Sequence, residues 1–355
     1  MVEEALRLCR GNVRLEVLTL GATLRRFEVL LPSGEWRNIV LGSAVVSDYL
    51  ESNRYVGMTV GRFANRIAGA RFALDGREYL LDANEPPNHL HGGAGGFHSR
   101  TWTVCGSGED WVELKLISPA GEQGYPGEVE VMARYQVLAD GAQVTYLAHT
   151  SEPTVLNVTT HPYFNLNGED AGTNTDRHQL QIHASSYTPN WDDGIPTGEI
   201  RKVEGSAADF RNGCHLGRAT HQAEGEGITR RGGFDHSFVV DGEGIREHCR
   251  LVGPDGLTLT IVSDQPALQV YGGDHFDGTQ VGTSGVPYVR RAGVALETQG
   301  FPDAPNHAGF PTTVLRPGEI YRTTTSWLVG SRTDVGLLEW RRMPARRPRK
   351  GSPAD

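Results

Sequence analysis

The stretch Val13-Arg14-Leu15-Glu16-Val17-Leu18-Thr19-Leu20 alternates apolar and polar side chains along most of its length. In an extended strand this alternation places every second side chain on one face, so one face can be buried while the other meets solvent. Similar alternation recurs at 112–117, 129–137, 179–182, 257–262 and 323–329. We therefore expect many half-buried antiparallel strands.

Turn residues separate these segments. Asp-Gly pairs suit the positive-φ positions of tight hairpins, and the chain has four that we expect to act in this way: Asp75-Gly76, Asp140-Gly141, Asp241-Gly242 and Asp255-Gly256. Helical patterning is weak, because only residues 47–52 suggest a single turn and no longer window spaces apolar residues by three and four. Many strands with few short helices indicate an all-β fold, either a large sandwich or a barrel.

Composition restricts the classes of partner. The chain has 355 residues and a formal net charge of -9, which argues against a nucleic-acid or anionic-membrane partner but says nothing about a neutral substrate. No run of about 18 apolar residues is present, and the charged start lacks an apolar signal core. We expect a cytoplasmic protein with reduced thiols, because the four cysteines are far apart: Cys9, Cys105, Cys214 and Cys249.

The chain shows no internal repeat and no linker, so we expect a single domain over residues 1–340. Residues 341–355 differ, because they contain six basic residues and three prolines with almost no apolar content. Such a segment cannot bury enough apolar surface to pack, and we expect a disordered tail. Binding of a polyanion by this tail is an alternative that the sequence leaves open.

A histidine at the centre of one β-forming stretch is the first candidate for chemistry: Asn157-Val158-Thr159-Thr160-His161-Pro162-Tyr163-Phe164-Asn165-Leu166. An imidazole titrates near neutrality, so His161 can give a proton in one step and recover it in the next. Glu297 lies in the apolar stretch 294–297. Burial raises the pKa of a carboxyl group unless donors or a cation keep it ionised, so this glutamate invites a functional explanation. A histidine satisfied by neighbours in the core is the structural alternative.

Two glycine-flanked segments carry further candidates. Residues 61–67 contain Arg62 and Arg66, one of which could fork onto a ligand oxygen rather than form a surface ion pair. In Asn88-His89-Leu90-His91-Gly92-Gly93 the two histidines stand two apart. On a strand they would share one face, which is also a spacing found among metal ligands.

Two later strands add polar side chains. Asp235 stands beside His236 at the head of an apolar strand, where an ordinary strand-entry aspartate is the alternative. In 267–271 the alternation puts Gln269 and Tyr271 on one face.

Taken together and in this order, these segments resemble the aldose 1-epimerases, the galactose mutarotases. The stretch around His161 is similar to the family's catalytic signature, with Thr160 where an asparagine is usual. The resemblance covers about residues 10–330 and is carried by Asn65-Arg66, Leu90-His91-Gly92-Gly93, Tyr187-Thr188-Pro189, Ile195-Pro196-Thr197-Gly198-Glu199, Asp235-His236, Gln269 and Leu296-Glu297-Thr298-Gln299. It implies a galactose mutarotase-like supersandwich, a large antiparallel β-sandwich with an open sugar-binding cleft.

The resemblance also implies an isomerase and a role for each matching residue. Glu297 would be the general base at the C1 hydroxyl of an aldose, His161 the general acid at the ring oxygen, and His91 an assistant on the ring-oxygen side. The sugar hydroxyls would be held by Arg66, Asn65, Asp235, Gln269 and Tyr271. Ring opening and reclosure involve no redox step or group transfer, so no cofactor and no metal is expected. We also expect the carboxylates of Glu297 and Asp235 to favour the protonated form of His161.

The implied substrate is a free aldose such as D-galactose or D-glucose, and the oligomeric state is open between a monomer and a weak dimer. Four other functions stay open. A hexose-6-phosphate 1-epimerase would need cationic groups for the phosphate, and a non-catalytic sugar-binding module would be expected to lack Glu297 or His161. A retaining glycoside hydrolase would use Asp235 and Glu297 about 5–5.5 Å apart. A metal enzyme would use His89, His91 and His161.

Overall fold

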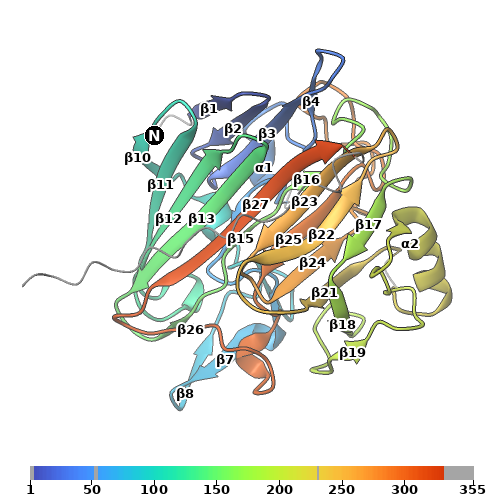
Figure 1. Cartoon of the computed structure of the whole chain (residues 1–355). Helices are drawn as coiled ribbons and strands as arrows, with labels where there is room; N and C mark the ends of the chain where they lie inside the picture. The colour runs from blue at the N-terminus through green and yellow to red at the C-terminus, as the bar shows by residue number, and fades with distance from the viewer. Residues whose placement is uncertain (1–3, 52–54, 230–231, 332–355) are drawn as a thin grey trace, which may run out of the picture.

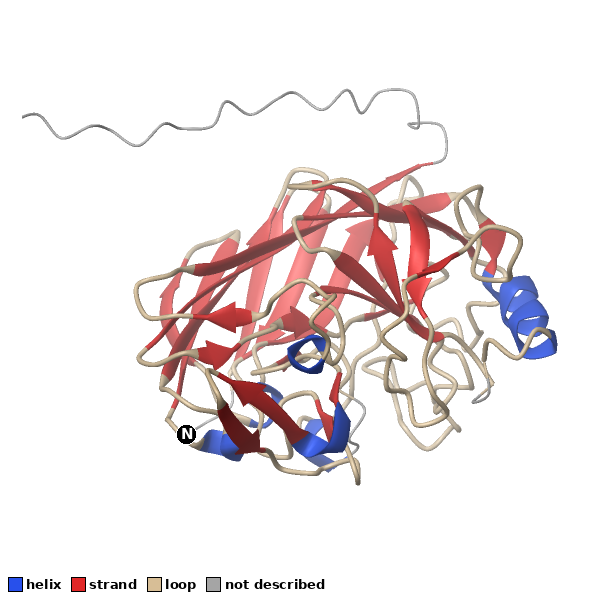
Figure 2. Ribbon diagram, turned by 90° about the horizontal axis from the view of Figure 1, so that it is seen from below, coloured by secondary structure: helices blue, strands red, loops and turns tan. Residues whose placement is uncertain are grey.

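The computed structural model describes residues 4–51, 55–229 and 232–331 (Figure 1). The expected tail at 341–355 and the end of the expected domain lie outside these residues. Strands are the main regular secondary structure of the described chain, as Figure 2 shows. The prediction of an all-β fold with few short helices is therefore confirmed. No helix within the described ranges is long and apolar enough to cross a membrane.

A nine-stranded antiparallel sheet runs across the whole molecule (Figure 1). In spatial order its strands are β10 (Thr103–Ser107), β11 (Trp111–Ser118), β12 (Val129–Val137), β13 (Gly141–Thr150), β27 (Tyr321–Ser331), β23 (Leu257–Ser263), β22 (Arg246–Val252), β17 (Gln179–Ile182) and β20 (Cys214–His215). Buried and half-buried residues alternate along the full length of β12. The period-two pattern at 129–137 therefore predicted both its bounds and its buried face.

Two smaller antiparallel sheets pack against one face of the large one. The first contains β1 (Ala5–Arg10), β2 (Val13–Leu18), β3 (Thr23–Leu30) and β4 (Trp36–Asn38), and the second β16 (Tyr163–Phe164), β25 (Val294–Gln299), β24 (Ala267–Tyr271), β21 (Asp235–Val240), β18 (Ala184–Thr188) and β19 (Arg201–Lys202). Trp327 of β27 shows how they meet, because its ring contacts Phe27 of the first sheet and Phe164 of the second, each at 6.4 Å between ring centroids. One continuous apolar core joins all three sheets.

Short strand pairs and helices complete the described chain. The pairs are β5 (Thr59–Val60) with β15 (Thr159–Thr160), β6 (Arg66–Ile67) with β9 (His89–Leu90), β7 (Arg71–Leu74) with β8 (Arg77–Leu80), and β14 (Thr154–Val155) with β26 (Val314–Leu315). The helices are α1 (Asp48–Glu51), α2 (Leu216–Gly225) and the 3-10 turns η1 (Ala68–Ala70), η2 (Phe97–Ser99), η3 (Glu122–Gly124) and η4 (Ala304–Asn306). The pairs β5–β15 and β6–β9 matter most for the site, because Arg66 lies in β6 and the site histidines, His161 and His91, directly follow β15 and β9.

The Asp-Gly pairs have the expected positive φ at Gly76, Gly242 and Gly256. Gly76 and Gly256 lie in hairpins, between β7 and β8 and between β22 and β23, whereas Gly242 lies in the turn from β21 to β22, which belong to different sheets. Gly141 differs, because it is the first residue of β13 and its φ is not positive. A Cβ at Gly141 would collide with the carbonyl oxygen of Trp327, so glycine is needed there for close strand approach.

Helix α1 lies within the expected turn at 47–52, whose last residue falls outside the described ranges. Helix α2, at one end of the molecule (Figure 1), was not predicted. Its buried positions are Leu216, Ala219, Thr220 and Ala223, which do follow helical spacing. Two of these four side chains are alanines and one is a threonine, so the apolar periodicity is too weak to be recognised in the sequence.

Candidate active site

The register of the six-stranded sheet gathers four of the predicted site residues on one face. Gln269 pairs with Glu297, and Tyr271 pairs with Asp235 across the other neighbour. Gln269 and Tyr271 are two residues apart, so all four side chains point to the same side. The intervening residues, such as Leu268 of β24, point into the core. Alternation thus separates a polar site face from an apolar core face.

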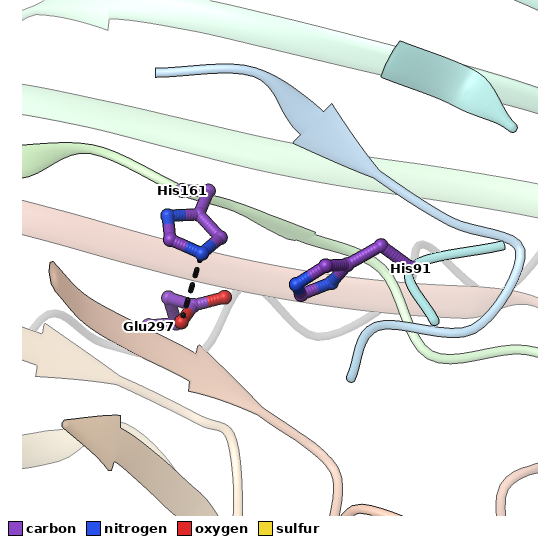
Figure 3. A group of neighbouring side chains, drawn as sticks. All are labelled: His91, His161 and Glu297. Carbon is purple, nitrogen blue, oxygen red and sulfur yellow. Dashed lines mark ion pairs between the residues drawn. The ribbon is translucent and has the colours of Figure 1, made fainter. Parts of the chain in front are cut away.

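His161 reaches this face from the connection between β15 and β16. Its backbone N–H donates to the carbonyl of Met58, and its carbonyl accepts from Gly57. Its Nε2 atom lies 3.4 Å from Oε1 of Glu297 (Figure 3). Both side chains are buried, with 5% and 2% exposure. The structure therefore brings the predicted acid and base, 136 residues apart in the chain, into direct proximity.

Burial controls the protonation of this pair. Loss of solvent raises the pKa of Glu297 well above its usual range, the charge of Asp235 adds to this, and Arg66 opposes it. Loss of solvent also lowers the pKa of His161 to about 4, against a weaker opposing effect of Asp235. Asp235 does favour the imidazolium, as expected, but desolvation outweighs this effect and the net pKa shift is downward. Burial therefore favours the uncharged form of each group, a neutral imidazole beside a neutral carboxyl group.

His91 is oriented by the backbone. The N–H of Asn65 donates to Nδ1 of His91 at 3.1 Å. Since Nδ1 accepts, a neutral imidazole must carry its proton on Nε2. The His91 ring centroid lies 5.3 Å from that of His161, and Figure 3 shows the His91 ring directed toward the His161–Glu297 pair. His91 can thus offer a hydrogen-bond donor to a substrate oxygen in the cleft.

The two neighbouring histidines do not share a face, contrary to our expectation. His91 has a φ of +50°, which ends the extended backbone after β9 and breaks the alternation. His89 turns into the interior, where its ring nitrogens bond the carbonyl of Asp82 and the hydroxyl of Tyr125. His89 is therefore a core histidine, and the metal set that included it is not assembled.

A different trio does come together. The ligand atoms of His91, His161 and Glu297 all lie within 4.8 Å of one another. Two neutral imidazoles and a carboxylate are a donor set that Zn²⁺ accepts. The same three residues also suffice for proton transfer to and from a sugar, so the trio by itself does not call for a metal.

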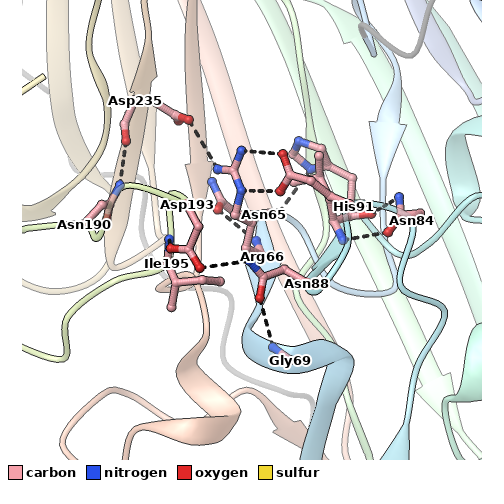
Figure 4. Close-up of polar contacts among 12 residues, drawn as sticks. Asn65, Arg66, Gly69, Asn84, Asn88, His91, Asn190, Asp193, Ile195 and Asp235 are labelled. Carbon is pink, nitrogen blue, oxygen red and sulfur yellow. Dashed lines mark hydrogen bonds and ion pairs between the residues drawn. The ribbon is translucent and has the colours of Figure 1, made fainter. Parts of the chain in front are cut away.

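Arg66 and Arg62 have different roles. Arg66 lies in the cleft and donates to Oδ2 of Asp235 at 3.2 Å (Figure 4). Arg62 is buried behind the site, where it donates to oxygen atoms of Ser118 and of the 119–127 loop. Its partners are neutral, and burial lowers its pKa to about 10. Arg62 therefore anchors the segment that carries Asn65 and Arg66.

The cleft has a volume of about 380 Å³. Seven of the eight predicted site residues line it: Asn65, Arg66, His91, His161, Asp235, Tyr271 and Glu297. Gln269 lies behind this surface and donates to Oδ1 of Asp235 at 2.6 Å. Its contact with Asp235 supports the cleft from behind.

Several cleft residues were not predicted: Tyr55, Glu85, Asp274 and His275. Glu85 lies three residues before Asn88, directly ahead of Pro86-Pro87. An acidic residue in such a turn, close to a segment with predicted site residues, was the sequence signal that could have identified it. Thr160, the departure from the family signature, is buried and donates to the carbonyl of Gly57 at 3.3 Å. It helps to hold the backbone beside His161 and does not line the cleft.

Comparison with known proteins agrees with this geometry. The family profile described as aldose 1-epimerase matches residues 4–327. Galactose mutarotase from Homo sapiens is 39% identical over 326 residues, covering 91% of this chain and 92% of its own length. Aldose 1-epimerase from Escherichia coli (strain K12) is 35% identical, covering 90% and 93%. The crystal structure of an aldose epimerase homologue from C. elegans superimposes with a TM-score of 0.86 at 26% identity, covering 93% of this chain and 99% of its own. The chain belongs to the aldose 1-epimerase family, whose members are isomerases.

Proposed function

We propose that this protein interconverts the α and β anomers of free aldoses such as D-galactose and D-glucose, by acid–base ring opening and reclosure. The observation that carries the proposal is the His161–Glu297 pair, in which an imidazole and a carboxyl group lie 3.4 Å apart in a polar cleft. The second carboxyl oxygen, Oε2 of Glu297, has no hydrogen-bond partner among the described residues. A buried acceptor without a partner makes the ionised form of the carboxyl group costly, in agreement with the raised pKa of Glu297.

In the proposed reaction, Glu297 takes the proton of the C1 hydroxyl as the C1–O5 bond breaks, and His161 gives a proton to the ring oxygen. The product is an open-chain aldehyde. Rotation about C1–C2 presents the other face of the carbonyl, and the same steps in reverse close the ring. One proton leaves the sugar and one enters it, so no electron acceptor and no leaving group is needed. General acid–base assistance of this kind contributes about 10²–10⁴-fold.

Burial favours the neutral forms of both groups, so the proton that it favours on Glu297 has to pass to His161 before the base can act. Sugar binding supplies a reason for this transfer. A C1 hydroxyl that donates to Glu297 stabilises the carboxylate, and the released proton has only the distance from Oε1 to Nε2 to travel. His91, with its proton on Nε2, can donate to the ring oxygen and stabilise charge that develops there.

The contacts disfavour two of the alternatives. In a retaining glycoside hydrolase Asp235 would be a nucleophile or acid, but its two oxygens accept from Arg66 and Gln269. A hexose-6-phosphate 1-epimerase would need a cation for the phosphate. Arg66 is the one arginine or lysine among the described residues that line the cleft, and it is already paired with carboxylates. A free neutral sugar fits this charge balance best. We further propose that the enzyme is a single domain and is cytoplasmic.

Polarimetry tests the proposal. The decay of optical rotation of fresh α-D-galactose is followed with the wild type, Glu297→Gln and His161→Asn, and calorimetry measures galactose binding in parallel. We expect both variants to lose at least about 10²-fold in kcat, because each removes a proton-transfer group. Rates near wild type in both variants refute the proposed roles. If the wild-type protein binds galactose but does not catalyse mutarotation, it is instead a non-catalytic sugar-binding module.

A further inference from the structure

Glu85 is a cleft carboxylate whose partner is the cleft arginine. Arg66 donates through Nε to one oxygen of Glu85 at 2.6 Å and through Nη2 to the other at 3.0 Å, a bidentate pairing. Its remaining nitrogen, Nη1, donates to Asp235 at 3.2 Å. Figure 4 shows the guanidinium of Arg66 directed toward the carboxyl group of Asp235. One cation therefore bridges two carboxylates, and it is 8% exposed.

The turn that carries Glu85 is itself fixed. Glu85 and Asn88 exchange backbone hydrogen bonds at 2.7 and 3.1 Å. The side chain of Asn88 then accepts from the N–H of Gly69 and donates to Asp193 (Figure 4). These hydrogen bonds hold the backbone of Glu85 in place on the β6–β9 side of the cleft. Its carboxylate can define where the guanidinium of Arg66 lies.

The opposite side of Arg66 is closed by backbone. Gly194 has a φ of +85°, and a Cβ at that position would lie 2.8 Å from Cζ of Arg66. A glycine is therefore required for this close approach. With Glu85 along one edge, Asp235 at the end and Gly194 close to the guanidinium carbon, Arg66 has little freedom to reorient.

The same arrangement sets the charge of the cleft. Glu85 and Asp235 both pair with the one guanidinium of Arg66, so this part of the cleft carries one surplus negative charge. Asp274 also lines the cavity, but it pairs with Arg290 and Arg291 and adds little to that surplus. A phosphate or carboxylate on a sugar would meet no unpaired arginine or lysine among the described lining residues. An anionic sugar would instead approach surplus negative charge at short range, where repulsion is strong.

We propose that Glu85 is a positioning residue that holds Arg66 in place for the sugar and, by cancelling its charge, makes the cleft prefer neutral over anionic sugars. This rests on the proposed mutarotase function. The contact of Glu85 is with Arg66, so its effect on the sugar passes through the guanidinium. Its loss should therefore weaken binding more than it slows proton transfer.

Two variants separate geometry from charge. Glu85→Gln keeps the size and removes the charge, whereas Glu85→Asp keeps the charge and shortens the side chain. Glu78→Gln is the matched control, because Glu78 is an exposed glutamate that pairs weakly with Arg71 at 3.8 Å outside the cleft. Galactose mutarotation gives KM and kcat by polarimetry. Calorimetry gives the Kd of galactose and of glucose 6-phosphate at low and high salt, independently of turnover.

For Glu85→Gln we expect the galactose KM and Kd to rise about tenfold, with kcat changed less than about threefold. We expect glucose 6-phosphate to bind about fivefold more tightly than to the wild type at low salt, and the gain to shrink at high salt. Glu85→Asp should weaken galactose binding without admitting the phosphate, and Glu78→Gln should resemble the wild type.

Galactose binding unchanged in both Glu85 variants would overturn the positioning role. Phosphate binding that stays weak in Glu85→Gln, or rises equally in Glu85→Asp, would overturn the charge role. If KM rises but kcat and the melting temperature fall with it, Glu85 has a structural role, and this result would also count against the proposal. A wild type without mutarotation defeats the proposed function instead, and the two failures are thus distinguishable.

Discussion

Replacing Gly194 with alanine should damage sugar binding through Arg66 while leaving the acid–base pair untouched. The new Cβ would lie 2.8 Å from Cζ of Arg66, well inside the ordinary contact distance of about 3.5–4.0 Å between carbon atoms. Arg66 can escape this overlap only by moving away from Glu85 or Asp235. Each charged hydrogen bond contributes about 1.5–3 kcal/mol.

A displaced Arg66 that loses one charged hydrogen bond to a sugar hydroxyl predicts a fall in kcat/KM of about 10- to 150-fold, expressed mostly as a rise in KM. Initial-rate polarimetry on α-D-galactose over a range of concentrations measures both constants. The substitution also places a side chain at positive φ, which costs about 1 kcal/mol and lowers the melting temperature by about 2 °C.

Gly205→Ala is the matched control, because Gly205 has a φ of +76° and nothing within 4 Å of the added Cβ. It should show the same small loss of stability with wild-type kinetics. The reasoning fails if Gly194→Ala keeps its KM, or if Gly205→Ala raises KM to the same extent, because the effect would then not come from the contact with Arg66.

Two predictions concern pH. Because burial lowers the pKa of His161 in the free enzyme to about 4, kcat/KM should hold from pH 6.5 down to about pH 5 and fall only as the free pair gains a second proton; a loss centred at pH 6.5 would contradict this. The free energy of unfolding should fall as pH drops from about 6.5 toward 4. In this range the histidines of the unfolded chain bind protons, whereas the buried histidines of the folded chain do not. Each such histidine contributes up to about 1.4 kcal/mol per pH unit. Urea unfolding at pH 7 and pH 5 measures this loss, and equal stability at both would refute it. The histidines concerned are His89, His98, His161, His178, His236 and His248.

The sequence predicted the strands well where one face is buried and the other is half-buried. The bounds of β12 and β17 match the alternating segments at 129–137 and 179–182. The shared face of Gln269 and Tyr271 also followed from alternation, and it led directly to the cleft. These features are local, so a short window of sequence contains the information that determines them.

Features that depend on contacts between distant segments were missed or wrong. The pairing of Glu85 with Arg66 joins strand β6 to a turn 19 residues later, and the two meet only in the folded chain. The separation of His89 from His91 depends on one positive φ, which a histidine seldom adopts. The pKa of His161 depends on burial by residues from several strands, which a local pattern of charges does not reveal.

The route by which His161 and Glu297 meet has a consequence for how the spacing of acid and base is maintained. Tyr163, two residues after His161, pairs with Ala295, two residues before Glu297. The 3.4 Å separation is therefore tied to the pairing of β16 with β25. A slip of one residue would turn Glu297 toward the core and remove the base altogether. Insertions in the surface loops between residues 166 and 293 would leave that pairing intact, so the chain between acid and base can diverge in length while their separation is conserved.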